Sequence, residues 1–257
     1  MFDIEKFDIK LGTDQIGRNF IYAEEVTSTN EVILNERKLY QEHGTVLLAE
    51  NQTAGKGRLN RPWYSVDEMN LTFSILILDA KYFRKKINIL NFTAAIAVAM
   101  SIENLFQLKT ELKWPNDVLI SNKKIAGVLL ESVSSGNKIE RLVVGIGLNV
   151  NQITFQGKFN VDPTSLKREL RQNIEREKLL AEILNNFEEL IETSVSKPKF
   201  ILDEWRSRCS LIGERITIAE NDKTRHGIFE DIDDEGFLIL KSNDALETIH
   251  FGDVSIL

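Results

Sequence analysis

Lys113, Asn116, Asp117 and Lys124 stand close together in the segment 112–131, which reads LKWPNDVLISNKKIAGVLLE. A proline interrupts a short apolar run, and Asn116 and Asp117 then provide turn chemistry, so the spacing predicts a strand, a tight turn and returning strands. Lys113 and Lys124 lie on or beside these strands. Lysine binds phosphate or carboxylate, and Asn and Asp oxygens bind hard cations, so one interpretation is an anion site beside a metal. The alternative is a solvated hairpin with scattered charges.

A second group of cations occupies the loop 51–63, NQTAGKGRLNRPW. Its two glycines allow backbone N–H groups to approach a phosphate, and Lys56, Arg58 and Arg61 would neutralise that phosphate. The loop lacks the GK[ST] ending of a P-loop and the third glycine of a dinucleotide fingerprint. It is either an anion-binding loop or a mobile surface loop, and Trp63 either stacks on a base or packs in the interior.

Small polar residues open a predicted helix at 27–30, TSTN. Ser28 or Thr29 is a natural N-cap and Gly44 is a natural C-terminal stop. Four polar groups at a helix N-terminus also suit a polar ligand. Local sequence therefore leaves two roles open for this cluster, capping alone or ligand binding.

Further elements must position these groups. The predicted strands are Phe20–Ala23, Thr45–Glu50, Asn70–Leu78 and Leu142–Val150, and the predicted helices are Ile87–Phe106, Glu177–Ser194 and Phe200–Arg208, with Thr164 and Ser165 capping a helix that starts at Leu166. Gly145 and Gly147 lie inside an apolar strand, where glycine marks either a close ligand approach or tight packing. Asn149 ends that strand.

After residue 212 the hydrophobic period changes from helical to alternating. Short strands are predicted at 215–218, 227–231, 237–240 and 248–251, with turns between them. A β-barrel of about 45 residues is too small to be stable alone, so we expect it to dock on the main domain. The predicted domains are 1–211 and 212–257.

Composition limits the function classes. The chain has 257 residues, a formal net charge of −7, 42% hydrophobic and 28% charged residues, typical of a globular protein with a full core. The acidic balance argues against a DNA-binding surface. A single cysteine, Cys209, excludes an internal disulfide, and His43, His226 and His250 lack metal-site spacing. We find no signal peptide and no run of membrane-spanning length, so we expect a cytoplasmic location.

KWPND followed by KIAGVLLE resembles the signature of biotin protein ligases (biotin–[acetyl-CoA-carboxylase] ligases). The same family has a Gly/Arg loop ending in Arg-x-Trp, a Gly-x-Gly-x-Asn strand, a Thr-Ser-Leu helix start and a small SH3-like barrel, and this chain is similar to it across its length and in that order. The resemblance implies an α+β fold, with a mixed sheet and flanking helices like the catalytic domain of class II aminoacyl-tRNA synthetases.

The resemblance also implies roles for individual residues. Lys124, Arg58 and Asp117 match the catalytic positions. The biotin-binding positions are matched by Ser28, Thr29, Asn30, Gln52, Lys56, Gly57, Arg58, Lys124, Gly127, Gly145 and Gly147. The ATP-binding positions are matched by Arg58, Arg61, Trp63, Lys113, Asn116, Asp117, Asn149, Ser165 and Arg168. Asn116 and Asp117 would lie near Mg²⁺, without a definite set of metal ligands.

The implied reaction forms biotinyl-5′-AMP from biotin and ATP and transfers biotin to a lysine of a biotin carboxyl carrier protein domain. No nucleic acid or membrane partner is expected, and the protein would be a monomer or a homodimer. Many bacterial relatives carry an N-terminal winged-helix DNA-binding domain, but fewer than thirty residues precede Ser28 here, so we expect no repressor function. Lys56 replaces a common Arg, which loses the bidentate fork, and Leu59-Asn60 replaces a common Arg-Gly pair.

Two other functions remain open from the sequence. A lipoate–protein ligase would share the fold class and the adenylation chemistry, but it should show an Arg-Arg-x-Ser-Gly-Gly-Gly type of loop, where this chain has AGKGR at 54–58. A non-catalytic biotin sensor would need no intact ATP site, whereas the matched ATP positions are present.

Overall fold

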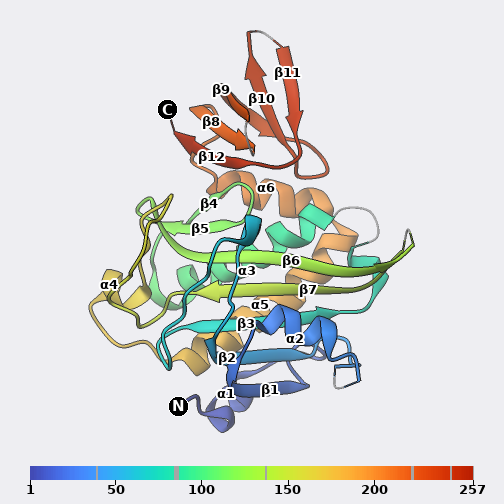
Figure 1. Cartoon of the computed structure of the whole chain (residues 1–257), viewed down its shortest axis with the longest axis vertical. Helices are drawn as coiled ribbons and strands as arrows, with labels where there is room; N and C mark the ends of the chain where they lie inside the picture. Colours follow the sequence, from blue (N-terminus) through green and yellow to red (C-terminus); the bar gives the residue numbers. More distant parts are fainter. Residues whose placement is uncertain (39, 84–86, 137, 221–222, 244, 257) are drawn as a thin grey trace.

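A seven-stranded mixed sheet forms the central layer of the computed structural model, which describes residues 1–38, 40–83, 87–136, 138–220, 223–243 and 245–256 (Figure 1). Its strand order is β1-β2-β3-β7-β6-β5-β4. The strands are β1 (Phe20–Val26), β2 (Val46–Gln52), β3 (Leu71–Ile77), β4 (Glu111–Lys113), β5 (Asp117–Ile120), β6 (Lys123–Ser135) and β7 (Lys138–Leu148). Only the β1–β2 pair is parallel among these neighbours. The expected α+β fold with a mixed sheet is confirmed.

Helices cover the two faces of this sheet unequally. Helices α3 (Ile87–Phe106), α5 (Arg176–Ser196) and α6 (Pro198–Arg208) pack on one face, and the short α2 (Thr29–Asn35) covers part of the other (Figure 1). Strand residues alternate accordingly, since Val46 and Leu48 join the main core while Leu47 packs beneath α2 with Ile33. The remaining helical segments are α1 (Ile4–Lys10), α4 (Leu166–Leu170), η1 (Arg58–Asn60) and η2 (Ala80–Tyr82).

Helix α3 is apolar on all sides because it lies between the sheet and the helices α5 and α6. Its alanines, Ala94, Ala95, Ala97 and Ala99, are fully buried and allow close packing. With 20 residues and a mean hydropathy of 1.6, the helix is long and apolar enough to cross a membrane, which corrects the expectation that no run reaches that length. However, 67% of its most apolar 18-residue window is buried inside the fold, as expected for the central helix of a core.

The C-terminal domain is a five-stranded antiparallel sheet in the order β11-β10-β9-β8-β12. Its strands are β8 (Arg215–Glu220), β9 (Lys223–Ile232), β10 (Leu238–Ser242), β11 (Ala245–Ile249) and β12 (Asp253–Ile256). The expected docking is confirmed, because Trp205 of α6 stacks on Phe92 and contacts Phe229, and the Trp114 Nε1 donates to the Gly236 carbonyl at 3.1 Å. The two domains therefore share one continuous core.

The structure corrects several predicted boundaries. Helix α1 and strand β12 were not predicted, and the strand expected at 248–251 ends at Ile249. Helix α2 ends at Asn35 rather than near Gly44, because the chain turns after Glu36 and Tyr40 packs into the cluster beneath α2. Gly44 instead has φ +79° in the turn that leads into β2. The turn expected at 221–222 and Asp244 of another turn lie outside the described residues.

A buried ion pair ties the central sheet to the start of α5. The carboxylate of Glu50, on β2, accepts hydrogen bonds from Arg176 at 2.5 and 2.9 Å and from the Tyr22 hydroxyl at 3.0 Å. Both charged side chains are almost fully buried. Burial on its own would raise the pKa of Glu50, but the hydrogen bonds and charge of Arg176 hold the pKa below its ordinary value of 4.5.

We expect Glu50→Gln to lower the free energy of unfolding at pH 7 by about 3–5 kcal/mol, because Arg176 would keep a buried charge without its partner. A carboxylate with a depressed pKa stabilises the fold above its unfolded-state pKa, and this contribution is lost as the pH falls through the lower folded-state pKa. The difference between parent and variant should therefore shrink below pH 4.5. Urea unfolding at pH 7 and at successively lower pH values measures both effects.

Glu140→Gln is the matched control, since the Glu140–Arg37 pair is about half exposed on both sides. It should cost less than about 1 kcal/mol and leave the pH dependence unchanged. Equal losses in the two variants would contradict the role assigned to Glu50.

Candidate active site

A cavity of about 350 Å³ opens on the face of the sheet that α2 covers only in part. All but three of the residues predicted for a site line this cavity. They are Ser28, Thr29, Asn30, Gln52, Lys56, Gly57, Arg58, Arg61, Trp63, Asn116, Asp117, Lys124, Gly127, Gly145, Gly147 and Asn149. Chain segments distant in sequence, from the start of α2 to β7, therefore meet at one place.

The cavity exists because the strands present small residues on this face. Side chains alternate along a strand, so Gly145 and Gly147 on β7 share the face of Val143, which packs beneath α2. Thr72 and Ser74 on β3 are their neighbours in the ladder, and Gly127 on β6 pairs with Gly147. A methyl group at Gly145 would overlap the Asn30 side chain, and one at Gly147 would overlap the indole of Trp63.

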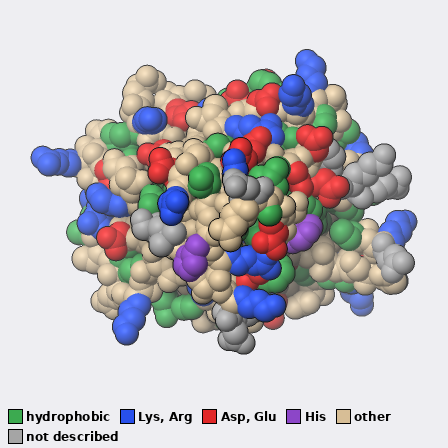
Figure 2. Space-filling model, turned by 90° about the horizontal axis from the view of Figure 1, so that it is seen from above, with side chains coloured by type: hydrophobic (Ala, Val, Ile, Leu, Met, Phe, Trp, Pro, Cys, Tyr) green, Lys and Arg blue, Asp and Glu red, His purple; other side chains and the backbone are tan. Residues whose placement is uncertain are grey.

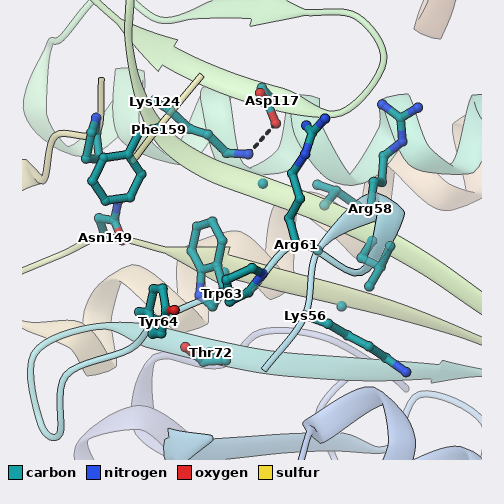
Figure 3. A pocket seen from close by; sticks show the side chains of 18 of the residues that line it. Lys56, Arg58, Arg61, Trp63, Tyr64, Thr72, Asp117, Lys124, Asn149 and Phe159 are labelled. Carbon is teal, nitrogen blue, oxygen red and sulfur yellow. Dashed lines mark ion pairs between the residues drawn. The ribbon is translucent and has the colours of Figure 1, made fainter. Parts of the chain in front are cut away.

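Trp63 lies over this floor of small residues, with the Lys124 ammonium 5.6 Å from its ring (Figure 3). Its indole Nε1 is buried and has no hydrogen-bond partner among the described residues. The Thr72 hydroxyl is also buried and has no hydrogen-bond partner in the described part of the chain. Buried polar groups are normally satisfied, so two unpaired groups lining one cavity point to a polar ligand.

A hydrogen-bonded chain of polar side chains forms the end of the cavity at the start of α2. Gln52 Oε1 accepts from the Thr29 N–H at 2.8 Å and from its hydroxyl at 3.1 Å. The Ser74 hydroxyl lies 2.7 Å from the Thr29 hydroxyl and 2.6 Å from Asn30 Oδ1. Asn30 Nδ2 donates to a carboxylate oxygen of Glu131 at 2.8 Å. Each amide group is thereby fixed in orientation before a ligand binds.

Ser28 is the N-cap of α2, but its hydroxyl makes no capping hydrogen bond among the described residues. It is buried and lines the cavity. This arrangement favours ligand binding over capping alone for the predicted polar cluster. Ser165, in contrast, caps α4 as predicted, because its hydroxyl oxygen accepts the Arg168 N–H at 3.2 Å.

Positive charge gathers at the other end of the cavity, and carboxylates face it. The Lys124 ammonium lies 2.6 Å from Asp117 (Figure 3). Lys56 instead pairs at 3.4 Å with Glu131, the carboxylate that also accepts a hydrogen bond from Asn30. Burial lowers the pKa of the Arg58 guanidinium, while the charges of Asp253 and Asp117 oppose the shift. The cations already face carboxylates, so a ligand that binds to them must carry more negative charge than a single carboxylate does, as a phosphate group can.

The Gly/Arg loop is folded into a small hairpin. Trp63 N–H donates to the Gly55 carbonyl at 2.9 Å, and Gly57 N–H donates to the Arg61 carbonyl at 2.7 Å. Leu59 and Asn60 form the tip with φ values of +54° and +55°. Glycine or asparagine favours that conformation, whereas leucine does not. The loop is therefore ordered here, with a strained tip.

Three predicted site residues lie outside the lining. Lys113 is half-buried on β4, where burial lowers its pKa and the charges of Asp117 and Asp253 oppose the shift. Ser165 is fully buried at the helix cap. The Arg168 guanidinium donates to the Pro163 carbonyl at 3.3 Å.

Some lining residues were not predicted from the sequence. Thr72 and Ser74, the latter part of the hydrogen-bond network, are polar residues inside a fully buried strand. Polar residues in such an apolar strand were a usable sequence signal of a functional site. Tyr64, Phe155 and Phe159 add aromatic surface, and Asp253 enters from the C-terminal domain. No local pattern marks Asp253, because only docking of the second domain brings it to the cavity.

The site offers oxygen ligands for a single hard cation rather than a complete protein cage. The Asp117 carboxylate offers one such oxygen. The Asn116 side chain offers its Oδ1, because its Nδ2 is the atom that donates to the Val128 carbonyl, at 2.6 Å. Among the described residues, no group of three or more His, Cys, Asp or Glu side chains could hold a metal. Mg²⁺ bound mainly through substrate phosphates and water fits such a site.

Comparison with known proteins identifies the family. Residues 22–149 match the model of the biotin/lipoate A/B protein ligase family, and residues 211–257 match that of the biotin protein ligase C-terminal domain. The chain is 31% identical over 260 residues to the bifunctional ligase/repressor BirA of Bacillus subtilis, covering 98% of this chain and 79% of the relative. The chain belongs to the biotin protein ligase family.

Other members of the family agree in sequence and in fold. Biotin–[acetyl-CoA-carboxylase] ligase of Paracoccus denitrificans is 32% identical over 216 residues, covering 81% of this chain and 88% of the relative. The biotin protein ligase of Aquifex aeolicus in complex with biotin and ATP has a TM-score of 0.80 at 28% identity, covering 93% of this chain and 99% of that chain. The biotin protein ligase fold is thus shared over nearly the whole molecule.

We expect Ser74→Ala to lower the free energy of unfolding by about 1–3 kcal/mol, because Asn30 Oδ1 would lose a buried donor. Urea unfolding followed by circular dichroism measures this loss. Thr93→Val is the control, since the Thr93 hydroxyl donates only to the Ile89 carbonyl within its own helix. A Ser74→Ala variant as stable as Thr93→Val would contradict the network.

Proposed function

We propose that this protein is an ATP-dependent ligase that forms biotinyl-5′-AMP and transfers biotin to a specific lysine of a biotin carboxyl carrier protein domain. The observation behind the proposal is one cavity that joins a polar, pre-oriented end to a cationic end over a floor of small residues. A bicyclic urea with an aliphatic carboxylate suits the first part, and a nucleotide phosphate suits the second. The Aquifex aeolicus relative was studied with both biotin and ATP bound.

In the first step a carboxylate oxygen of biotin attacks the α-phosphorus of ATP, and pyrophosphate leaves. Phosphoryl transfer needs positioning and charge stabilisation more than a protein nucleophile. Lys124 lies beside the floor glycine Gly127 and can contact both the biotin carboxylate and the α-phosphate. Arg58 and Arg61 would bind the phosphates, and Mg²⁺, held near Asp117 and Asn116, would neutralise part of the triphosphate charge.

In the second step the acceptor lysine attacks the acyl carbon of the mixed anhydride, an amide bond forms, and AMP leaves with the bonding electron pair. The attacking amine must lose a proton, which goes to Asp117 or to water. The ion pair with Lys124 places the Asp117 carboxylate at the reacting end of the cavity. The ureido ring would be bound by Ser28, Thr29, Asn30 and Gln52 at the other end.

The remaining assignments complete the proposal. Residues 1–211 form the biotin- and ATP-binding domain and residues 212–257 the SH3-like domain. Trp63 and Asn149 contact the adenine, while Lys113, Ser165 and Arg168 act from outside the lining. The protein works in the cytoplasm as a monomer or homodimer, without nucleic acid or membrane. The net charge of −7 and the mixed acidic and basic side chains on the face shown in Figure 2 support the absence of a nucleic-acid partner.

The direct test combines the protein with biotin, ATP, Mg²⁺ and an acceptor carrier domain. Biotin on the acceptor lysine, with release of AMP and pyrophosphate, supports the ligase. Lipoate incorporation in place of biotin would instead identify a lipoate ligase. Biotin binding without AMP formation would identify a biotin sensor.

We expect Lys124→Ala to slow adenylate formation by roughly a hundredfold or more. The variant loses a charged hydrogen bond to the developing anion, which costs about 3 kcal/mol or roughly a hundredfold in rate. Biotin-dependent exchange of labelled pyrophosphate into ATP is the measurement. Lys123→Ala is the control, because the side chain of the neighbouring Lys123 is 45% exposed and lies 3.7 Å from Glu169. Near-normal exchange in Lys124→Ala would refute the role of this lysine.

We expect Arg58→Gly to separate the two half-reactions. The substitution removes a charge-assisted contact between Arg58 and the phosphate, worth about 1.5–3 kcal/mol, and adds backbone freedom to the hairpin. Both effects favour opening of the hairpin away from the bound adenylate. Adenylate should still form, because Lys124, Arg61 and Mg²⁺ remain, but it should escape and acylate unrelated lysines. The measurement is a biotin blot of a lysine-rich bystander protein incubated with the variant, biotin and ATP.

The control for Arg58→Gly is Arg37→Gly, since Arg37 lies on the surface and pairs with Glu140. It should label the bystander no more than the parent protein does. If Arg58→Gly makes adenylate yet labels no more than this control, the hairpin does not retain the intermediate.

A further inference from the structure

The two arginines of the hairpin are held by the C-terminal domain. Arg58 donates to the Gly252 carbonyl at 3.2 Å, and its guanidinium lies 3.7 Å from the Asp253 carboxylate. Arg61 donates a charged hydrogen bond to the other oxygen of the same carboxylate. One acidic residue on β12 therefore bridges two cations that lie almost two hundred positions earlier in the chain.

In the described part of the chain, the hydrogen bonds and ion pairs of these two guanidinium groups all go to Gly252 and Asp253. Among the described residues, the backbone hydrogen bonds between Gly55 and Trp63 stay within the hairpin, whereas the Thr53 and Ala54 N–H groups at its base donate to the Val26 and Thr27 carbonyls. Away from the tip, Lys56 pairs with Glu131 at 3.4 Å, and Trp63 packs against Gly147. The arginine tip thus depends on the second domain for its position.

The residues that hold the arginines lie at the start of β12 in the C-terminal sheet. Gly252 has φ +141°, and a side chain there would overlap Ile218, so the chain turns sharply into β12 at this point. Asp253 then pairs with Ala219 of β8 in the sheet ladder. Its side chain is only 23% exposed, which limits screening by solvent. A carboxylate on a strand is positioned more accurately than one on a loop.

We propose that Asp253 is a positioning residue for nucleotide binding, contributed to the catalytic cavity by the C-terminal domain. Each guanidinium has five N–H donors, and Asp253 occupies one edge of each, so other donors remain for phosphate oxygens. Holding two long side chains in place beforehand reduces the entropy that nucleotide binding must otherwise cost. This role rests on the proposed ligase function, because it concerns the same phosphate-binding arginines.

The proposal predicts a selective defect in Asp253→Ala. The Michaelis constant for ATP should rise about tenfold while that for biotin changes less than about twofold, because the polar end of the cavity is untouched. Asp253→Glu should restore most of the ATP affinity, since it returns the charge to the arginines. Steady-state biotinylation of a carrier domain at varied ATP and varied biotin measures both constants in the full-length protein.

The matched control is Asp231→Ala. Asp231 also joins the two domains, through a 2.7 Å hydrogen bond from Arg206 of α6, but it does not line the cavity. If Asp231→Ala raises the constant for ATP as much as Asp253→Ala does, the effect is one of domain docking and the proposal fails. It also fails if Asp253→Ala leaves that constant unchanged or lowers it, because the carboxylate would then be inert or a competitor of phosphate.

Limited trypsin digestion tests the same proposal independently of catalysis. Without nucleotide, Asp253→Ala should be cut after Lys56 and Arg58 at least several-fold faster than the parent protein, whereas Asp231→Ala and Asp253→Glu should not. The bond after Arg61 is protected by Pro62 in every variant. Equal rates in Asp253→Ala and the parent would show that the hairpin does not need Asp253, whether or not the protein is a ligase.

Discussion

The site depends on the lack of bulk on one face of the sheet. At the start of α2 and beyond it, strands β3, β6 and β7 present Thr72, Ser74, Gly127, Gly145 and Gly147, where ordinary strands would present branched side chains. The same strands are densely packed on their other face by α3. Helix α2 is too short to cover this face of the sheet, and the side chains on the face are too small to fill the space that is left. A cavity results, so the binding site follows from the packing of the fold.

Charge is distributed so that the cations along this cavity are stable without a ligand. Lys124 pairs with Asp117, Lys56 with Glu131, and Arg58 and Arg61 with Asp253. An uncompensated group of four half-buried cations would repel itself, and each desolvated charge would be costly. The carboxylates remove that cost while leaving several N–H donors unused. A polyanion can then bind to cations that are already in position.

Much of the site could be predicted because its residues belong to short continuous motifs. The KWPND hairpin, the Gly/Arg loop and the glycine-rich strand each place several lining residues within a few positions of one another. Strand order and the side chains that meet across the docked domains are different, because they depend on contacts between distant segments. Asp253 was missed for that reason, whereas Ser74 carried a local signal, a polar residue in a buried strand, that was not used. Helix α2 was predicted too long because the packing of Tyr40, rather than Gly44, determines where its chain turns.

The left-handed backbone at the tip of the hairpin makes the order of this loop sensitive to substitution at the tip. Leu59 and Asn60 hold φ values of +54° and +55°, a pair that asparagine and glycine adopt at little cost and leucine does not. A residue in this region costs on the order of 1–2 kcal/mol, and 1.4 kcal/mol changes an equilibrium tenfold. Since Leu59 is 57% exposed, its replacement would change little besides this conformational term. The fraction of time for which the loop is ordered is therefore open to adjustment by mutation at the tip, without any change to the residues that line the cavity.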